Sequence, residues 1–553
     1  NNGEAKNFSY ENNVSGFNVT FAASDSLFEN YELPGGALYP EEHHDEEHSD
    51  SEGDEEHDES SLKFLENSDV ENTYTKFGVS KVGDWGYVGL SYSDNEGVMG
   101  VPFHVEVHGE HDEDHVDSED EHDEHEGERI FSQIDSTKFD IKGSFNTDGY
   151  SFVNKVDFSF RDSSYSHLEG HAEEEGHDED HSESEEKSSL FQTDATELGL
   201  IFDVGSDDVT RKFVVNVAEQ DSSIVGEEAF MQPVSTKETT MGYFSARDFG
   251  TYRLDYGIRY DDISRSGSVS HHDEDHAEDE EGELEYYNQD LSTLSYAINF
   301  DQDFSQNLSV NLGLSSFERA PDVVELFMNG PHLATGRFEM GNPNLDTETS
   351  NNVDLTFNYQ KDNMYATFAY YQNSVSDYIY LKDEEHGEDH DSEGEEEHEG
   401  LMHAEFVQED ASLEGYEFEV GSTYQLANGT LDLSFGRDVV EGTLDAGGFI
   451  PRMAPSRNFY SASYSESDYT FSAVLKDVAD HDNVAEENEM MTEGYKMLNL
   501  KLVKDYQIGK ANLRLAAFAN NALDQVARNS TSFVKDAVPL PGRNVGLSFR
   551  LTY

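Results

Sequence analysis

The sequence contains no cysteine, one tryptophan, and only 34 lysine and arginine residues against 119 aspartate and glutamate residues. Without cysteine, disulfides, thiolate metal sites and cysteine nucleophiles are all excluded. The formal net charge of -85 excludes nucleic acid as a partner, because binding to phosphates requires a basic surface. An acidic surface instead attracts cations and concentrates them near the protein.

Long hydrophobic runs are also missing. No stretch of about 18 apolar residues occurs, so the sequence contains no transmembrane helix. No charged segment followed by an apolar one stands at Asn1, and we expect that any signal peptide has been removed. No Ser-His-Asp or Gly-x-Ser-x-Gly arrangement stands out in a strand–turn–helix context, so the chain is not expected to be an enzyme.

Five acidic, low-complexity tracts interrupt the sequence, at residues 41–60, 104–128, 167–187, 271–284 and 383–403. They contain 21 of the 23 histidines, all except His332 and His481. Dense like charges repel one another and leave no apolar face to bury, so we expect these tracts to be mobile loops.

Between the tracts, apolar residues alternate with polar ones in about twenty runs, which gives each run one apolar and one polar face, as in a β-strand. The alternation is clearest at residues 308–314, 353–359, 431–435 and 544–553. Many runs are separated by brief turn signals, such as Asn428-Gly429, Lys361–Asn363 and Asn146–Gly149. Glycine and asparagine tolerate the positive φ angles that tight hairpins need.

Short turns on one rim and long loops on the other are typical of outer-membrane barrels. We therefore predict an all-β chain, in which residues 1–553 form a transmembrane antiparallel β-barrel of about 22 strands. The five tracts would be its long extracellular loops, all on one rim. The alternative, a large soluble all-β protein such as a propeller, is disfavoured because no blade-length repeat is visible.

Several motifs in the second half of the sequence resemble those of the TonB-dependent outer-membrane receptor family. They are Phe317–Pro321, Glu325–Phe327, Gly330–Thr335 and Phe338–Pro343 in the middle of the barrel, and Asn520–Asp524 and Pro539–Arg543 near its end. The resemblance implies a Gram-negative outer-membrane location with contacts to lipid and lipopolysaccharide. It also implies a periplasmic partner, the energy-coupling protein TonB.

Within the family, the zinc-uptake receptor branch (ZnuD-like) is the most similar. Three segments carry this narrower resemblance: Gly97–His104 running into a His-rich tract, the Gly330–Thr335 block, and Ser530–Lys535. The family's N-terminal plug and its TonB-engaging box are absent from this sequence. We therefore expect the chain to be the barrel without its plug, and metal ligands that a plug would supply cannot be assigned.

Imidazole together with carboxylate is the ligand set of zinc, and also of copper, nickel and cobalt, whereas calcium and magnesium need only oxygen ligands. The tract histidines therefore predict binding of a divalent transition metal. Seven pairs have a spacing of four residues, which places both imidazoles on one face of a helical turn, although a repeating His-Asp-Glu sequence also produces it by chance. These pairs are His44 and His48, His104 and His108, His111 and His115, His167 and His171, His177 and His181, His272 and His276, and His386 and His390.

His332 is the best candidate for a tight site, because it lies outside the tracts in the block that resembles the family. It would need further ligands, for which His104, Glu325, Glu339 and plug residues are the candidates. The alternative is a histidine that only packs within its loop. His481, between two aspartates, is interpreted as an ordinary polar loop residue.

These observations predict energy-coupled import of a transition metal, with Zn²⁺ as the transported ligand and the His-rich tracts capturing the ion. One alternative is a receptor for haem or a siderophore-type metal chelate. Haem, however, needs few axial ligands and an apolar pocket rather than many solvated histidines. The other alternative is a passive pore or a surface metal-binding protein.

Overall fold

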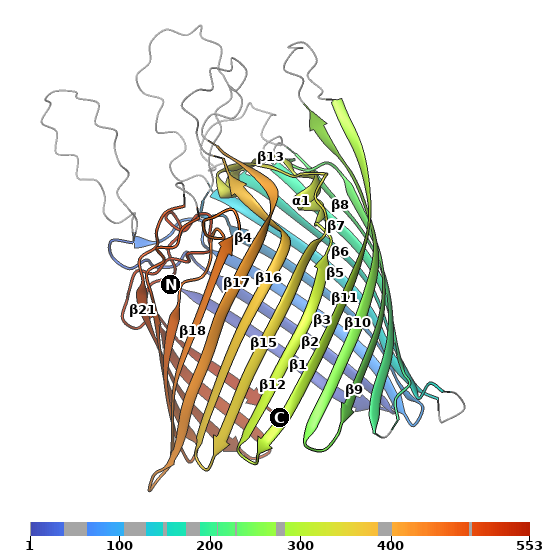
Figure 1. Ribbon diagram of the computed structural model, residues 1–553. Coiled ribbons are helices and arrows are strands. Elements are labelled where there is room, and N and C mark those ends of the chain that lie inside the picture. The colour runs from blue at the N-terminus through green and yellow to red at the C-terminus, as the bar shows by residue number, and fades with distance from the viewer. Residues whose placement is uncertain are drawn as a thin grey trace, which may run out of the picture.

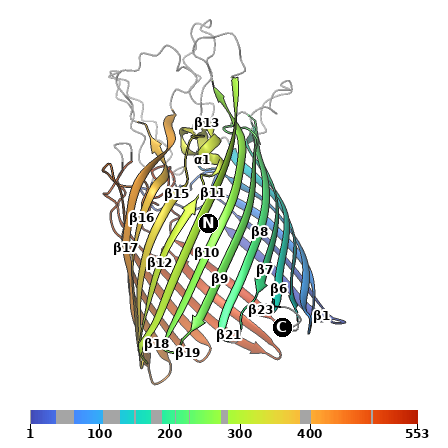
Figure 2. The ribbon, with the colours of Figure 1, turned by 45° about the vertical axis from the view of Figure 1, so that its right-hand side comes forward.

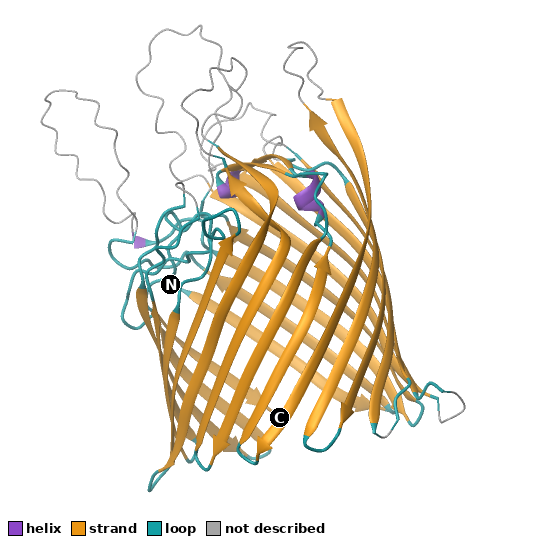
Figure 3. Ribbon diagram, viewed as in Figure 1, coloured by secondary structure: helices purple, strands orange, loops and turns teal. Residues whose placement is uncertain are grey.

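The computed structural model describes residues 2–37, 63–103, 129–147, 152–172, 188–206, 208–226, 229–271, 283–384, 401–485 and 489–553. They form a tall β-barrel, with the longer loops and the short helical segments at one rim (Figures 1, 2 and 3). Helix α1 (Val323–Phe327) and the 3-10 turn η2 (Leu333–Thr335) lie at this rim. No helix within the described ranges is long and apolar enough to cross a membrane.

Twenty-three strands belong to one sheet, and all but β13 and β14 make the barrel wall. The wall strands are β1 (Gly3–Val14), β2 (Phe17–Phe28), β3 (Val70–Gly83), β4 (Gly86–Gly100), β5 (Arg129–Asn146), β6 (Lys155–Ala172), β7 (Ser188–Asp203), β8 (Val209–Val225), β9 (Val234–Asp248), β10 (Tyr252–His271), β11 (Glu283–Ser305), β12 (Leu308–Arg319), β15 (Glu348–Lys361), β16 (Met364–Asp383), β17 (Met402–Gln425), β18 (Thr430–Leu444), β19 (Arg457–Glu466), β20 (Tyr469–Val478), β21 (Tyr495–Ile508), β22 (Ala511–Asn520) and β23 (Asn544–Thr552). Each pairs antiparallel with the next, and β12 pairs with β15. Between β23 and β1, no pairing occurs among the described residues.

The predicted antiparallel barrel is confirmed, and so is the alternation that predicted it. On β23, Val545 and Leu547 are more than 70% exposed, as expected for a face that meets lipid. On β10, Ile258 is exposed, whereas Arg259 and Asp261 form an ion pair on the opposite face. Apolar side chains therefore point outward and paired charges point into the lumen.

The predicted turns fall at the rim opposite the long loops. Asp362, between β15 and β16, has a φ of 51°, and Gly429 precedes β18. β5 ends at Asn146 as expected, while residues 148–151 lie outside the described part of the chain. Among the described residues the sheet has 23 strands, of which 21 form the wall, against about 22 predicted; β13 (Asn329–His332) and β14 (Arg337–Met340) form a small hairpin inside the mouth.

The strand ends that flank the five tracts lie at the same rim, because the register is continuous around the wall. The flanking pairs are Phe28 with Val70, Gly100 with Phe131, Gly170 with Ser188, His271 with Glu283, and Asp383 with Ala404. The central parts of the tracts lie outside the described residues.

The predicted tract boundaries are wrong where strands continue into them. β6 extends to Ala172, β10 includes His271, and β17 begins at Met402. Backbone pairing across the ladder does not depend on side-chain polarity, so acidic residues can extend a strand at the rim. Positions 167 and 171 therefore lie on a strand, about 13 Å apart along it, and cannot chelate one ion as a helical pair would.

A hydrophobic cluster fixes α1 and the β13–β14 hairpin to the inside of the wall. Leu326 and Phe327 are completely buried. Phe327 packs so closely on Gly267 of β10 that a Cβ added to this glycine would lie 2.7 Å from the ring. The Asn329 amide donates to the Phe230 carbonyl at 2.6 Å. The hairpin is therefore held as rigidly as the wall itself.

Candidate functional site

His332 lies at the tip of the β13–β14 hairpin, where η2 turns the chain back through Gly336 at a φ of 66°. Its Nδ1 is 3.0 Å from Oε1 of Glu339, whose side chain is only 6% exposed. The Thr335 hydroxyl donates to the same carboxylate oxygen at 2.8 Å. The His332 side chain itself remains one-third exposed.

In this geometry, Nε2 of His332 is the ring nitrogen that could hold a metal ion. A carboxylate accepts hydrogen bonds, so Glu339 favours the tautomer with the proton on Nδ1 and a lone pair on Nε2. A carboxylate behind a histidine in this way fixes the orientation of the ring, as in many metal sites. His332 is thus a preoriented imidazole at the mouth of the barrel.

Of the other expected partners of His332, Glu325 is engaged elsewhere. Glu325 accepts hydrogen bonds from Arg319 and from the Asp322 amide, and thereby caps α1. His104 lies outside the described residues. Within those residues, no group of three or more His, Asp or Glu side chains could hold a metal ion. A tight site at His332 therefore needs additional ligands.

A buried ion-pair cluster lies next to this hairpin. Arg337 of β14 donates from Nε and Nη2 to the two carboxylate oxygens of Asp383, both at 2.9 Å. Arg452, between β18 and β19, lies 3.4 Å from the same carboxylate and donates to the Leu381 carbonyl at 2.8 Å. The Asp383 side chain is 2% exposed, so its charge depends on the two arginines for compensation.

Phe533 joins the two arginines from the other side. Its ring centroid is 4.5 Å from the Arg337 guanidinium and 4.2 Å from that of Arg452. Phe533 belongs to the Ser530–Lys535 motif, whereas Arg337 follows the Gly330–Thr335 motif. Two parts of the chain that are distant in sequence therefore meet in space.

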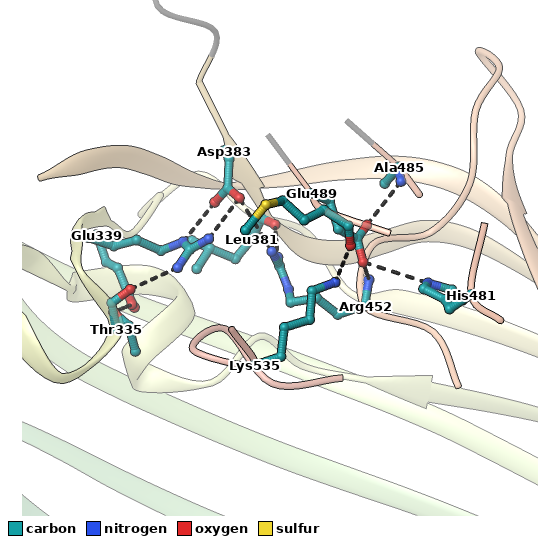
Figure 4. Close-up of polar contacts among 11 residues, drawn as sticks. Thr335, Glu339, Leu381, Asp383, Arg452, His481, Ala485, Glu489 and Lys535 are labelled. Atoms are coloured by element: carbon teal, nitrogen blue, oxygen red, sulfur yellow. Dashed lines mark hydrogen bonds and ion pairs between the residues drawn. The ribbon is translucent and has the colours of Figure 1, made fainter. Parts of the chain in front are cut away.

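A second polar group extends this cluster across the loops (Figure 4). Glu489 accepts hydrogen bonds from the backbone amides of Arg452, at 3.0 Å, and Ala485, at 2.9 Å. Its Oε1 is 3.7 Å from Nε2 of His481, and Lys535 donates to the Met490 carbonyl nearby. We call the combined set of Arg337, Asp383, Arg452, His481, Glu489, Phe533 and Lys535 the mouth cluster.

His481 is therefore buried, at 4% exposure, and the interpretation as an ordinary polar loop residue is wrong. Three loops fold over it, and nothing in its polar neighbourhood in the sequence indicates that burial. Burial lowers the pKa of His481, Glu489 opposes this change, and Lys535 adds to it.

Of the other predicted ligands, only His167 has a described side chain. It lies on β6, with Nε2 3.9 Å from Oε2 of Glu169 and its ring stacked on Phe191. His171 lies on the same strand. The remaining predicted ligands lie outside the described residues: His44, His48, His104, His108, His111, His115, His177, His181, His272, His276, His386 and His390.

Comparison with known proteins identifies one matching family model and several solved structures with a similar fold. Residues 65–522 match the family model described as TonB dependent receptor-like, beta-barrel. The structure is similar to the Copper transporter OprC, with a TM-score of 0.70 and 14% identity over 99% of this chain and 78% of that chain. It is also similar to the FrpB iron transporter from Neisseria meningitidis (F3-3 variant), with a TM-score of 0.67 and 13% identity over 100% of this chain and 80% of that chain.

A third similar structure is the closed form of the ferric-catecholate import receptor Fiu from K12 E. coli. It has a TM-score of 0.62 and 10% identity over 99% of this chain and 79% of that chain. At these identities the three likenesses concern the barrel fold.

Replacing Asp383 by Asn should loosen the hairpin, because Arg337 and Arg452 would lose their buried counter-charge. We expect the local free energy of opening of residues 329–340, measured by amide hydrogen exchange, to fall by about 3–5 kcal/mol. The matched control is Asp505→Asn, which breaks the exposed pair with Arg514 and should leave the protection of residues 329–340 unchanged. Equal protection of the hairpin in both variants would contradict this role of Asp383.

Acid should loosen the loop around His481. Because the pKa of His481 is lower in the folded protein, the unfolded loop binds more protons below about pH 6.5. The contribution of neutral His481 to the stability of the loop is therefore complete above that pH. It is lost as the pH falls toward the pKa that His481 has in the folded protein. Hydrogen exchange at the bridge between His481 and Thr492 should show less protection under mild acid in the wild type than in His481→Gln. An identical pH response of the two proteins would be inconsistent with this assignment.

Proposed function

The chain belongs to the TonB-dependent receptor β-barrel family, and we propose that it imports a divalent transition metal ion, with zinc favoured over other metals. It is a Gram-negative outer-membrane barrel and not an enzyme, and its family implies TonB as the energy-coupling partner. The similar structures include a copper transporter, an iron transporter and a ferric-catecholate import receptor. The choice of cargo must therefore come from this chain's own residues.

The observation that carries the proposal is the His332–Glu339 pair. It supplies a fixed imidazole in a chain with a net charge of -85. Nitrogen ligands in an acidic field suit zinc, copper, nickel or cobalt ions, whereas calcium and magnesium prefer oxygen ligands. Zinc is favoured by the resemblance of the Gly330–Thr335 and Ser530–Lys535 segments to the zinc-uptake branch. The second of these segments contributes Phe533 and Lys535 to the mouth cluster.

An anionic metal chelate is a weaker candidate for the cargo. Binding an anionic chelate would require available cationic side chains at the mouth. Arg337 and Arg452 are already bound to Asp383, and Arg319 is bound to Glu325 and Glu348. A free cation is attracted by the surrounding acidic surface, whereas an anion is repelled.

The acidic tracts would act before His332. Their histidines are interchangeable with one another, so each would bind weakly and exchange rapidly, which raises the metal concentration at the mouth. Coupling to TonB separates this proposal from a passive pore. Zinc accumulation that continued undiminished after collapse of the proton-motive force would favour the pore.

Replacing His332 by Ala in the intact receptor should lower the affinity of the tightest zinc site at least about 100-fold and impair growth on scarce zinc. Glu339→Gln should weaken binding about 10-fold to 100-fold, because the ligand stays but its orientation is lost. The control is His111→Ala, a single tract histidine, which we expect to change neither quantity measurably. Affinity is measured by competition with a zinc chelator on the folded receptor in detergent. Unchanged affinity and growth in His332→Ala would refute the proposal that His332 binds the cargo.

A further inference from the structure

A continuous stack of five aromatic rings connects the barrel wall to His332. Starting on β6, the centroid of Tyr165 is 6.0 Å from that of His167, and His167 is 4.1 Å from Phe191 with the planes only 11° apart. Phe191 is 5.6 Å from Phe230, and Phe230 is 5.1 Å from His332. The stack thus has an imidazole near each end and two phenyl rings between them.

The strand register holds the wall end of this stack in place. His167 and Phe191 are direct partners in the ladder between β6 and β7, so their rings face each other across one rung. Phe191 and Phe230 pack against the hydrophobic cluster that also fixes α1 and the hairpin. The spacing between the two imidazoles is therefore set by rigid elements.

His167 also has its own carboxylate. Its Nε2 is 3.9 Å from Oε2 of Glu169, which lies two residues further on the same face of β6. Its Nδ1 is 3.3 Å from the Tyr165 hydroxyl. The side chains of His167 and Glu169 are 22% and 14% exposed, so solvent reaches both.

Together, these contacts repeat at the wall the arrangement found at the hairpin, an imidazole beside a carboxylate with a phenyl ring against its face. The two imidazoles cannot share one ion, because zinc–nitrogen bonds are about 2.0–2.1 Å long and two phenyl rings lie between them. With only two ligands, the His167–Glu169 pair would bind more weakly than a complete site. Weak binding would allow the ion to dissociate and pass to the next binding position.

We propose that His167 and Glu169 form a second binding position for the transition-metal ion, which the ion occupies before it reaches His332. The pair stands on β6 just before the acidic tract that follows Ala172, so it is the fixed imidazole closest in sequence to those tract histidines. This inference rests on the proposed function, since it concerns the same cargo. The competing role for His167 is that of an aromatic spacer in the stack.

Residue-resolved chemical footprinting tests the position directly. Zinc added to the folded receptor should protect His167 from carbethoxylation by diethyl pyrocarbonate, read out by mass spectrometry. In Glu169→Gln, the zinc concentration needed for half-protection should rise about tenfold. If zinc leaves the modification of His167 unchanged in both proteins, no ion binds there and the inference is wrong.

Two substitutions at position 167 separate a ligand from a spacer. His167→Phe keeps an aromatic ring on Phe191 but removes the nitrogen ligands, whereas His167→Ala removes both. A ligand role predicts that both variants slow the initial uptake of radioactive zinc about tenfold, while the affinity of the tightest site is kept. A spacer role predicts normal uptake in His167→Phe and slow uptake in His167→Ala.

The His332→Ala variant, measured in parallel, separates the two claims. If His332→Ala loses tight zinc binding while His167→Phe takes up zinc normally, the inference about His167 fails and the proposed function stands. If neither variant changes binding or uptake, the proposal that His332 binds the cargo fails as well.

Discussion

Lipid offers the backbone no hydrogen-bond partners, so every amide and carbonyl in a membrane-spanning wall must be satisfied within the sheet. That constraint keeps each wall strand from β1 to β23 paired with the next, with register shifts at Asp303–Ser305 and Val375–Tyr378. β12 pairs directly with β15, and the intervening residues fold into the mouth. Once the register is fixed, period-two alternation decides which side chains face the lumen. The position of His167 opposite Phe191, and of Asp383 at the rim, both follow from it.

The mouth is built differently from the wall, because loops cannot rely on a ladder. There, buried ion pairs and apolar packing hold the loops in place. Asp383 binds Arg337 and Arg452, both arginines stack on Phe533, and α1 packs against β10. Breaking one partner of such a buried cluster leaves an uncompensated charge, so these loops have few alternative arrangements. The benefit for function is a hairpin rigid enough to present one imidazole in one orientation.

The strands and turns, which depend on local residue patterns, were predicted well from the sequence. The alternation at 544–553 and the turn at Lys361–Asn363 correspond to β23 and to the turn before β16, and the Gly330–Thr335 block marked the segment that carries His332. Contacts between distant segments left no local signal. Arg337 and Asp383 are 46 residues apart, and His481 is buried although its sequence neighbours are polar. The i, i+4 spacing of His167 and His171 suggested a helical turn, but backbone pairing made it a strand.

The central claim is that a rigid hairpin presents His332 to the cargo through Nε2, with Glu339 behind Nδ1. Diffraction data collected on both sides of the zinc absorption edge, from crystals of the intact receptor equilibrated with zinc, test it most directly. The account predicts an anomalous difference peak about 2.0–2.1 Å from Nε2 of His332, with the hydrogen bond to Glu339 retained. Anomalous peaks confined to the acidic tracts, with none at His332, would contradict it.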